Sequence, residues 1–357
     1  MSGQDVLVVG AGLGGLAFAH DAARAGLRVR LLDKARGVSG RAATRRVTLP
    51  DGQEAHLDHG ARFFTARSDR ARALAEGGVR DGWNAVWTLG MARWQAGTVT
   101  VPPDGHPRYA PPAGMSTLGR TLARGLDVTT GVTVTSLQRL NATRGGWRVH
   151  SREGLYWDAA TLILNLPAPQ LLTLLATLDP ASPAASPAAG PAARHAQGSA
   201  GAAQQARLVT YDPCWAAGVM LRHDVSADWS ALRPEHPVLE WIAREHTKRR
   251  DGAPPSLTLH ATPAWSRANL ERTPEQVLPD LLAAAQEILG PLDTAQVFAH
   301  RWRYAIPAVT APGPCHWDAT LNLGWCGDWF TPDPHGPRVE SALLSGWTLA
   351  RRVTGTA

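Results

Sequence analysis

Several features that mark other classes of protein are missing from this chain of 357 residues. It has only three cysteines and no C-x-x-C pair, which excludes a disulfide scaffold or redox dithiol and suggests reduced thiols in a cytoplasm. No His/Cys cluster has metal-ligand spacing, so we expect no metal. No apolar run approaches the roughly 20 residues of a membrane span. The chain enters a strand directly, so we expect no cleaved signal.

Lysine is almost absent, since Lys34 and Lys248 are the only two among 36 basic residues. The net charge is +6. The arginines are spread along the chain and no nucleic-acid module is recognisable, which argues against nucleic-acid binding and favours a base composition rich in arginine codons. A modest preference for anionic substrates stays open. The 14 tryptophans are unusual, and we expect most in the core and a few facing a flat aromatic ligand.

The first 33 residues carry the order of elements that binds a dinucleotide. A short apolar run at residues 6–9 leads into Gly10-Ala11-Gly12-Leu13-Gly14-Gly15, which opens a helix-compatible stretch at residues 13–25. Asp33 ends a second apolar run at residues 29–32. This order predicts that a pyrophosphate meets the helix N-terminus and that Asp33 accepts hydrogen bonds from the 2′-OH of the adenosine ribose.

Two further signals select the cofactor. The segment Gly37-Val38-Ser39-Gly40-Arg41 resembles the second motif of FAD-binding flavoproteins, in which the arginine pairs with the pyrophosphate. Near the other end, an apolar run leads into Gly327-Asp328, which resembles the site that holds the ribityl chain. A helix expected from about residue 337 to 353 follows and can direct its N-terminal dipole at the same cofactor. Only one G-x-G-x-x-G occurs, which argues against a two-nucleotide disulfide reductase.

Because the first and last segments would share one cofactor, the cofactor domain must be discontinuous. We expect an α/β fold, with a Rossmann-like FAD-binding domain and a discontinuous second α+β substrate domain. The FAD-binding domain is predicted at residues 1–82, 111–178 and 316–357, and the substrate domain at 83–110 and 206–315. Residues 179–205, dominated by Ala, Pro, Gly and Ser, are predicted to be a flexible insertion.

The patterning also predicts individual elements. Residues 47–50 and 54–57 flank Asp51-Gly52 and indicate a hairpin. Helices are expected at residues 68–76, 116–126, 170–178 and 274–289. Strands are expected within 128–149 and at 161–164, 216–222, 256–260, 295–302 and 321–325.

Seven motifs follow one another along the chain, at residues 40–46, 58–67, 213–215, 260–266, 300–304, 326–329 and 337–346. The first reads G-R-A-A-T-R-R and the second D-H-G-A-R-F-F-T-A-R. In content and order they resemble bacterial members of the renalase family, a branch of the FAD-dependent amine-oxidase-like proteins. The match covers nearly the whole chain except the insertion. Arg62 and Phe63 stand where the family has Gln and Tyr, and residues 245–248 also depart from its pattern, which leaves substrate preference open.

This resemblance implies a p-hydroxybenzoate-hydroxylase-like fold with noncovalent FAD. The implied reaction oxidises aberrant dihydronicotinamide isomers of NAD(P)H: hydride passes to flavin N5 to give NAD(P)+, and O2 reoxidises the flavin to give H2O2. The partners are then a small dihydronicotinamide substrate and O2. Motifs and resemblance together predict these FAD-binding residues: Gly10, Gly12, Leu13, Gly14, Gly15, Asp33, Lys34, Gly40, Arg41, Thr44, Gly60, Ala61, Arg62, Val134, Gly327, Asp328, Arg338 and Val339.

A dihydronicotinamide is already a strong hydride donor, so the protein must mainly position its ring and stabilise the reduced flavin. The catalytic candidates, all in substrate positioning, are His260, Trp302 and Arg62. His260 could bind the carboxamide, although a structural histidine is an alternative. Trp302, Tyr304 and Trp215 could face the ring or pack in the core. Lys248 and the two arginines after it could meet substrate phosphates or form a solvated charge run.

Two other functions stay open from the sequence. One is an FAD-dependent oxidase of a small amine, which would require an apolar or aromatic cage. The other is an FAD-binding protein without turnover.

Overall fold

The computed structural model describes residues 4–102, 104–140, 145–178, 201, 203–250, 252–330, 336 and 338–356. The chain divides into two compact units. Unit 1 consists of Met1–Gly40, Leu118–Thr210 and Pro307–Ala357, and unit 2 of Arg41–Thr117 and Tyr211–Ile306. Each unit is therefore assembled from segments that are far apart in sequence. The predicted flexible insertion lies largely outside the described residues.

Unit 1 is built on a mixed sheet in the order β10-β11-β12-β1-β2-β9, with β19 paired to β12 and β18 to β19. β1 is parallel to both β2 and β12, which makes it a central strand buried on both faces. The strands are β1 Gln4–Val9, β2 Val29–Asp33, β9 Asp127–Thr130, β10 Val134–Arg139, β11 Trp147–Ser151, β12 Tyr156–Leu164, β18 His316–Asp318 and β19 Leu323–Trp325.

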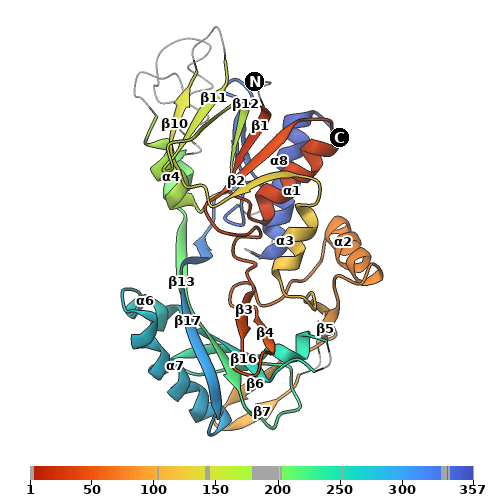
Figure 1. Ribbon diagram of the computed structural model, residues 1–357, viewed down its shortest axis with the longest axis vertical. Helices are drawn as coiled ribbons and strands as arrows, with labels where there is room; N and C mark the ends of the chain where they lie inside the picture. The colour runs from red at the N-terminus through yellow and green to blue at the C-terminus, as the bar shows by residue number, and fades with distance from the viewer. Residues whose placement is uncertain are drawn as a thin grey trace. The chain divides into compact units, whose positions relative to one another are not determined.

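Two helices from opposite ends of the chain, α1 (Leu13–Arg24) and α8 (Val339–Thr354), lie side by side next to this sheet (Figure 1). Their backbones approach closely, because a Cβ on Gly346 would stand 2.1 Å from the carbonyl oxygen of Gly14. Both helices match the predicted ones within a few residues. The remaining helices here are α3 (Ser116–Leu122) and α4 (Ala168–Leu175). α3 ends before the predicted residue 126, and Gly125 follows in the left-handed region at φ 76°.

Unit 2 contains a seven-stranded sheet in the order β17-β13-β16-β15-β14-β6-β7. One face of it packs against α7 (Pro274–Leu289), whose Val277 and Leu281 contact buried residues such as Leu257 and Leu259; α6 (Pro263–Ala268) lies nearby (Figure 1). The strands are β6 Ala92–Gln95, β7 Thr98–Thr100, β13 Thr210–Leu221, β14 Ala231–Pro234, β15 Leu239–Arg244, β16 Ser256–Ala261 and β17 Thr294–Val309.

The opposite face of this sheet, here called the inner face, is covered by residues 41–64 and 87–91. The hairpin of β3 (Arg45–Thr48) and β4 (Glu54–Leu57) packs Leu57 against Met220 and Phe298. Because strand side chains alternate, His260 and Trp241 also lie on the inner face. The remaining elements of unit 2 are α2 (Asp69–Arg80), β5 (Val86–Thr88), β8 (Arg108–Tyr109) and the 3-10 helix η1 (Glu245–Lys248).

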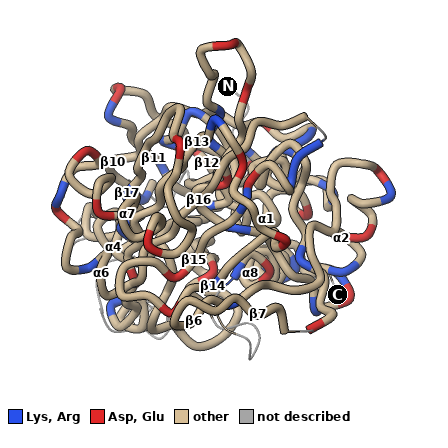
Figure 2. The backbone as a smooth tube through the Cα atoms, turned by 90° about the horizontal axis from the view of Figure 1, so that it is seen from below, with Lys and Arg blue, Asp and Glu red and all other residues tan. Residues whose placement is uncertain are grey.

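Residues 41–82 thus pack within unit 2, although the sequence assigns them to the cofactor domain. Packing alone does not decide which ligand they touch, so that assignment stays a prediction. Positive and negative residues are interspersed in the view of Figure 2. Among the described residues, no helix has the length and apolar character needed to cross a bilayer.

Candidate cofactor and substrate sites

The glycine turn after β1 is too crowded for side chains. A Cβ on Gly10 would stand 2.2 Å from the carbonyl oxygen of Asn165, and one on Gly15 would stand 2.3 Å from that of Gly10. Gly10 also has φ 102°, which side chains rarely permit. The turn therefore brings bare backbone to the start of α1, as a pyrophosphate requires.

The second predicted motif lies directly against this turn. The N–H of Ser39 donates to the carbonyl of Ala11 at 2.8 Å, and an isolated bridge joins Ser39 to Gly12. A Cβ on Gly40 would stand only 3.2 Å from the Cα of Gly12. Two signals about 25 residues apart in sequence therefore form one structural feature of unit 1.

Both helix N-termini in this region lack a side-chain cap. Gly12 precedes α1 and Arg338 precedes α8, and neither helix receives a side-chain cap from the described residues. Arg338 is extended, and its guanidinium donates to Glu340. The first turns of α1 and α8 are adjacent, since a Cβ on Gly14 would stand 3.1 Å from the carbonyl of Ala342. Two adjacent positive dipole ends suit an anionic cofactor.

Asp33 holds the backbone around the predicted ribose position. Its carboxylate oxygens accept from the N–H groups of Ala11 and Ala35, each at 2.7 Å. Burial raises the pKa of Asp33, and these two hydrogen bonds oppose the rise. The N–H of Val132 donates to the Asp33 carbonyl at 2.9 Å, which brings the start of β10, with Val134, to the same end of β2. Lys34 is exposed.

The Gly327-Asp328 segment is joined to the same region. The N–H of Gly327 donates to the Ser345 hydroxyl of α8 at 3.0 Å, and the Asn165 amide donates to the Cys326 carbonyl at 3.0 Å. Asp328 itself is half-buried. Asn165 thus connects the glycine turn to the C-terminal segment, a role that its position after an apolar strand did not reveal. The residues of unit 1 fit an extended dinucleotide cofactor.

Unit 2 contains a buried cluster of four charged side chains, here called the charge cluster: Asp58, Glu245, Lys248 and Arg249. The Lys248 ammonium donates to Glu245 at 2.6 Å and to the Arg62 carbonyl at 2.7 Å, and lies 3.4 Å from Asp58. Arg249 Nη2 donates to Asp58 and Glu245, both at 2.8 Å. The prediction of a solvated charge run is therefore wrong for Lys248 and Arg249, because both counterions come from buried positions.

The pKa values of the two acids of the charge cluster are shifted in opposite directions. Burial alone would raise the pKa of Asp58, but the charges of Arg249 and Lys248 outweigh it and the pKa is lowered. Burial raises the pKa of Glu245, and the nearby Asp58 charge adds to the rise. Asp58 also accepts from the Thr44 hydroxyl at 2.7 Å, which fixes one predicted cofactor residue to the cluster.

Arg41, Gly60 and Ala61 form one tight backbone contact. The N–H of Ala61 donates to the Arg41 carbonyl at 2.8 Å, and a Cβ on Gly60 would stand 1.9 Å from that same oxygen. The Arg41 guanidinium donates to the carbonyls of Tyr304 and Ala305. Its pairing with a pyrophosphate stays a prediction.

Arg62 links two further residues on the inner face. Its Nε donates to His260 Nδ1 at 2.8 Å, its Nη2 pairs with Glu240, and its guanidinium lies 5.0 Å from the Trp241 ring. The register of β15 against β16 shifts between Leu239 and Trp241, so Glu240 is the extra residue of a β-bulge. A bulge turns a side chain that would otherwise alternate away. This explains how Glu240 and Trp241 can both reach Arg62.

The contact with Arg62 fixes the tautomer of His260. Guanidinium N–H groups only donate, so His260 Nδ1 must accept and its proton sits on Nε2. Burial, helped by the charges of Arg62 and Lys248, holds the pKa of His260 well below its ordinary value, so the ring stays neutral. His260 Nε2 and Trp241 Nε1 are both buried and have no hydrogen-bond partner among the described residues. Each buried donor left unpaired costs about 1–3 kcal/mol.

Trp302 belongs to a neighbouring aromatic group. Its Nε1 donates to the His59 carbonyl at 2.7 Å, and its ring stacks on His59 at 5.4 Å and lies 4.3 Å from His300. Trp302 and Tyr304 lie two positions apart on one strand, β17, as predicted. Trp215 instead packs on the sheet face covered by α7, in agreement with the core alternative given for it.

Two family models match the chain. One described as "NAD(P)-binding Rossmann-like domain" matches residues 8–76, and one described as "Flavin containing amine oxidoreductase" matches residues 95–354, more than half of the chain. The protein belongs to the flavin-containing amine oxidoreductase family. It is a flavin-dependent oxidoreductase with FAD as its cofactor. The predicted α/β class, with a Rossmann-like domain and a second sheet-rich domain, is confirmed.

Solved structures share this fold over almost the entire chain. A protein from Exiguobacterium sp. 255-15 with a provisional protoporphyrinogen oxidase assignment gives a TM-score of 0.70 at 13% identity, covering 100% of both chains. Putrescine oxidase bound to putrescine gives 0.69 at 14%, covering 99% of each. Cyclohexylamine oxidase from Brevibacterium oxydans IH-35A gives 0.70 at 12%, covering 99% of each. At these identities the likeness establishes the fold alone.

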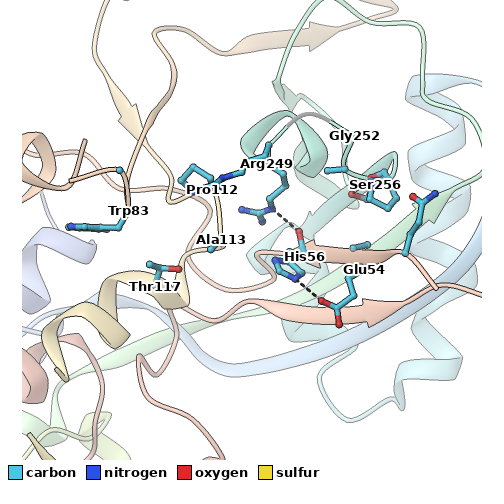
Figure 3. Close-up of a pocket in the computed structure, with 15 residues that line it drawn as sticks. Glu54, His56, Trp83, Pro112, Ala113, Thr117, Arg249, Gly252 and Ser256 are labelled. Atoms are coloured by element: carbon cyan, nitrogen blue, oxygen red, sulfur yellow. Dashed lines mark hydrogen bonds and ion pairs between the residues drawn. The ribbon is translucent and has the colours of Figure 1, made fainter. Parts of the chain in front are cut away.

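This amine oxidoreductase also has a cavity of about 540 Å³ away from the predicted cofactor and catalytic residues (Figure 3). It is lined by β4, by Gly82 and Trp83 just after α2, and by residues around Arg249, whose Nε donates to the His56 carbonyl at 3.0 Å. His56 lies 3.6 Å from Glu54 on the same strand. None of the predicted catalytic residues contributes to its walls.

Sequence reasoning found His260 and Arg62, and the structure joins them by a hydrogen bond. It missed Glu240 and Trp241. A bulge cannot be recognised from the residue pattern of one strand, since it depends on pairing with the neighbouring strand. A better signal was available for the charge cluster: Glu245 stands three and four residues before Lys248 and Arg249, the spacing of one helical turn.

Proposed function

We propose that this protein is a renalase-like oxidase of aberrant dihydronicotinamide isomers of NAD(P)H. The observation that carries the proposal is the pair of buried N–H donors at His260 and Trp241 that have no partner in the described part of the chain. A carboxamide oxygen is an acceptor that would satisfy them, and the neutral His260 ring presents its donor across the physiological pH range. The ordered motifs at residues 40–46 and 58–67 add independent support.

When bound, FAD would supply the hydride acceptor, so that the substrate leaves as NAD(P)+ and O2 takes up the two electrons to give H2O2. The unit 1 residues proposed to hold it are the glycine turn, Asp33, Gly327-Asp328 and the start of α8. His260 and Trp241 orient the carboxamide. Arg62 fixes the His260 tautomer, and Glu240 fixes Arg62. No proton has to be removed from the substrate, so no general base is required.

The balance of charge on the inner face favours this substrate over a small amine. Arg62 and Arg233 lie near Glu240, and Glu240 is already engaged by Arg62. An ammonium ion would meet net positive charge there, whereas an anionic dinucleotide would be attracted. An amine oxidase nevertheless remains the second candidate, because the family and the aromatic residues Phe63, Trp87 and Trp241 are compatible with an amine cage.

Anaerobic flavin reduction tests the proposal. The purified yellow protein is mixed with the dihydronicotinamide isomers made by borohydride reduction of NAD+, and absorbance near the flavin maximum is followed. Rapid bleaching by the isomers, with slow bleaching by ordinary NADH as the matched control, is expected. Bleaching by putrescine or cyclohexylamine but not by the isomers would establish the amine candidate. Bleaching by no donor would indicate a binding protein without turnover.

A further inference from the structure

A row of side chains crosses four neighbouring strands on the inner face. His260 on β16 is paired with Trp241 on β15. The register of β14 against β15 continues this row to Arg233, and Arg233 is paired with Arg93 on β6. Ala231, two residues before Arg233, packs with Trp241, which places both β14 residues on the inner face. The row therefore runs from two neutral N–H donors to two cations.

Among the described residues, the guanidinium groups of Arg93 and Arg233 have no counterion. Neither side chain forms an ion pair or hydrogen bond with any residue in the described parts of the chain. The acids nearby are already used, because Glu240 pairs with Arg62 and Asp104 pairs with Arg108. The side chains of Arg93 and Arg233 are exposed, but partial desolvation and the charges of Arg62 and Arg108 still lower the pKa of Arg233. Like charges opposite each other on adjacent strands are destabilising, so this arrangement calls for an anion.

We propose that Arg93 and Arg233 bind the phosphate groups of the dinucleotide substrate whose carboxamide is held by His260 and Trp241. This inference rests on the proposed function. Strands are about 4.8 Å apart, so Arg233 lies two spacings, about 10 Å, and Arg93 about 14 Å from the His260 strand. In the substrate a ribose separates the nicotinamide from the pyrophosphate. A row that changes from N–H donors to guanidinium groups over this span matches the order of groups along one dinucleotide.

The test compares two substrates that share the reacting ring. One is the borohydride-reduced isomer mixture from NAD+; the other is the same mixture made from nicotinamide riboside, which has no phosphate. In Arg93→Gln/Arg233→Gln, KM for the dinucleotide isomers should rise about tenfold or more, since two charge-assisted contacts are lost. The limiting rate of flavin reduction and KM for the riboside isomers should stay within about twofold of wild type. A variant that carries Arg233→Lys in place of Arg233→Gln should regain part of the lost affinity for the dinucleotide isomers. Arg80→Gln, which changes an exposed arginine at the end of α2, is the matched control.

Each outcome decides between the claims. An unchanged KM for the dinucleotide, or an equal rise for both substrates, would overturn the phosphate assignment while leaving the oxidase intact. A wild-type flavin that neither the dinucleotide isomers nor the riboside isomers reduce would instead overturn the proposed function, since the riboside reaction does not involve the two arginines. Flavin content and melting temperature of the double variant confirm that it is folded, as expected for side chains without protein partners.

Discussion

At the scale of single residues, the only two lysines of the chain occupy opposite environments. Lys34 is exposed beside the predicted ribose position, whereas the Lys248 side chain is fully buried between Asp58 and Glu245. The sequence could suggest a charge run but not its burial, because the carboxylate of Asp58 comes from a segment 190 residues away. The two lysines therefore differ in their environment, which depends on packing and is not visible in the composition.

This difference predicts unequal costs of removing each charge. Lys248→Met leaves two buried carboxylates facing one guanidinium and should lower the free energy of unfolding by about 3–5 kcal/mol. Lys34→Met should change it by less than about 0.5 kcal/mol. Urea unfolding at pH 8 measures both. In the Lys248 variant Glu245, whose pKa is already raised, should take up a proton, so its deficit should shrink at pH 6. A pH-independent deficit would contradict this account.

At the scale of elements, the sequence predicted helices well where their ends are encoded locally. α7 has the bounds that the sequence predicts, and the structure shows why its ends are well defined: Pro274 begins it, Thr273 and Gln276 form a capping box, and Gly290 ends it. α2 runs past its predicted end at residue 76, since Gly77 and Gly78 are tolerated inside it and Gly78 packs against Trp83. The bulge at Glu240 and the pairing of α1 with α8 depend on residues far away in the sequence, so local sequence patterns do not predict them.

The contact between α1 and α8 gives a prediction at this scale. In Gly346→Ala the new Cβ would meet the Gly14 carbonyl at 2.1 Å, so the helices must separate. We expect a loss of about 1–3 kcal/mol in stability and reduced FAD retention, because the glycine turn begins α1. Gly77→Ala is the matched control: its Cβ would have only Arg80 nearby, at 3.7 Å, and should stabilise α2 by about 0.5–1 kcal/mol. Full FAD occupancy in Gly346→Ala would separate cofactor binding from this helix contact.

At the scale of the whole molecule, buried histidines make the protein sensitive to acid. Burial, with His300 adding to the effect, lowers the pKa of His59 to about 4, and burial likewise lowers the pKa of His316 in unit 1 to about 4. Burial also lowers the pKa of His300. As pH falls below the ordinary value of 6.5, the unfolded chain takes up these protons first. The stability they contribute is thus present above pH 6.5 and lost as pH falls toward 4.

The expected loss for His59 is up to about 3 kcal/mol over that interval. Urea unfolding between pH 7.5 and 4 measures it. His59→Gln should flatten the decline, while His223→Gln, which changes a histidine that is 85% exposed, should leave the slope as in wild type. An identical decline in both variants would show that other groups govern the acid response.

The discontinuous organisation was predictable in outline but not in detail. Cofactor signals at both ends required the first and last segments to meet, and unit 1 contains both. The placement of residues 41–82 in unit 2 was not predicted, because it depends on the β3–β4 hairpin packing on β13 and β17 and on Asp58 joining the charge cluster. Such contacts become visible only when distant strands are aligned.

The segmented composition of unit 1 has a consequence for biosynthesis. Its sheet and helix pair need residues 307–357, which leave the ribosome after unit 2 is complete, because unit 2 has all its residues once Ile306 has been made. Unit 2 can therefore fold during translation, whereas β1 and α1 cannot complete their packing until α8 has been synthesised. A premature stop shortly after residue 306 would yield a product with an intact second sheet and an unfinished cofactor cradle, which cellular proteases would be expected to remove.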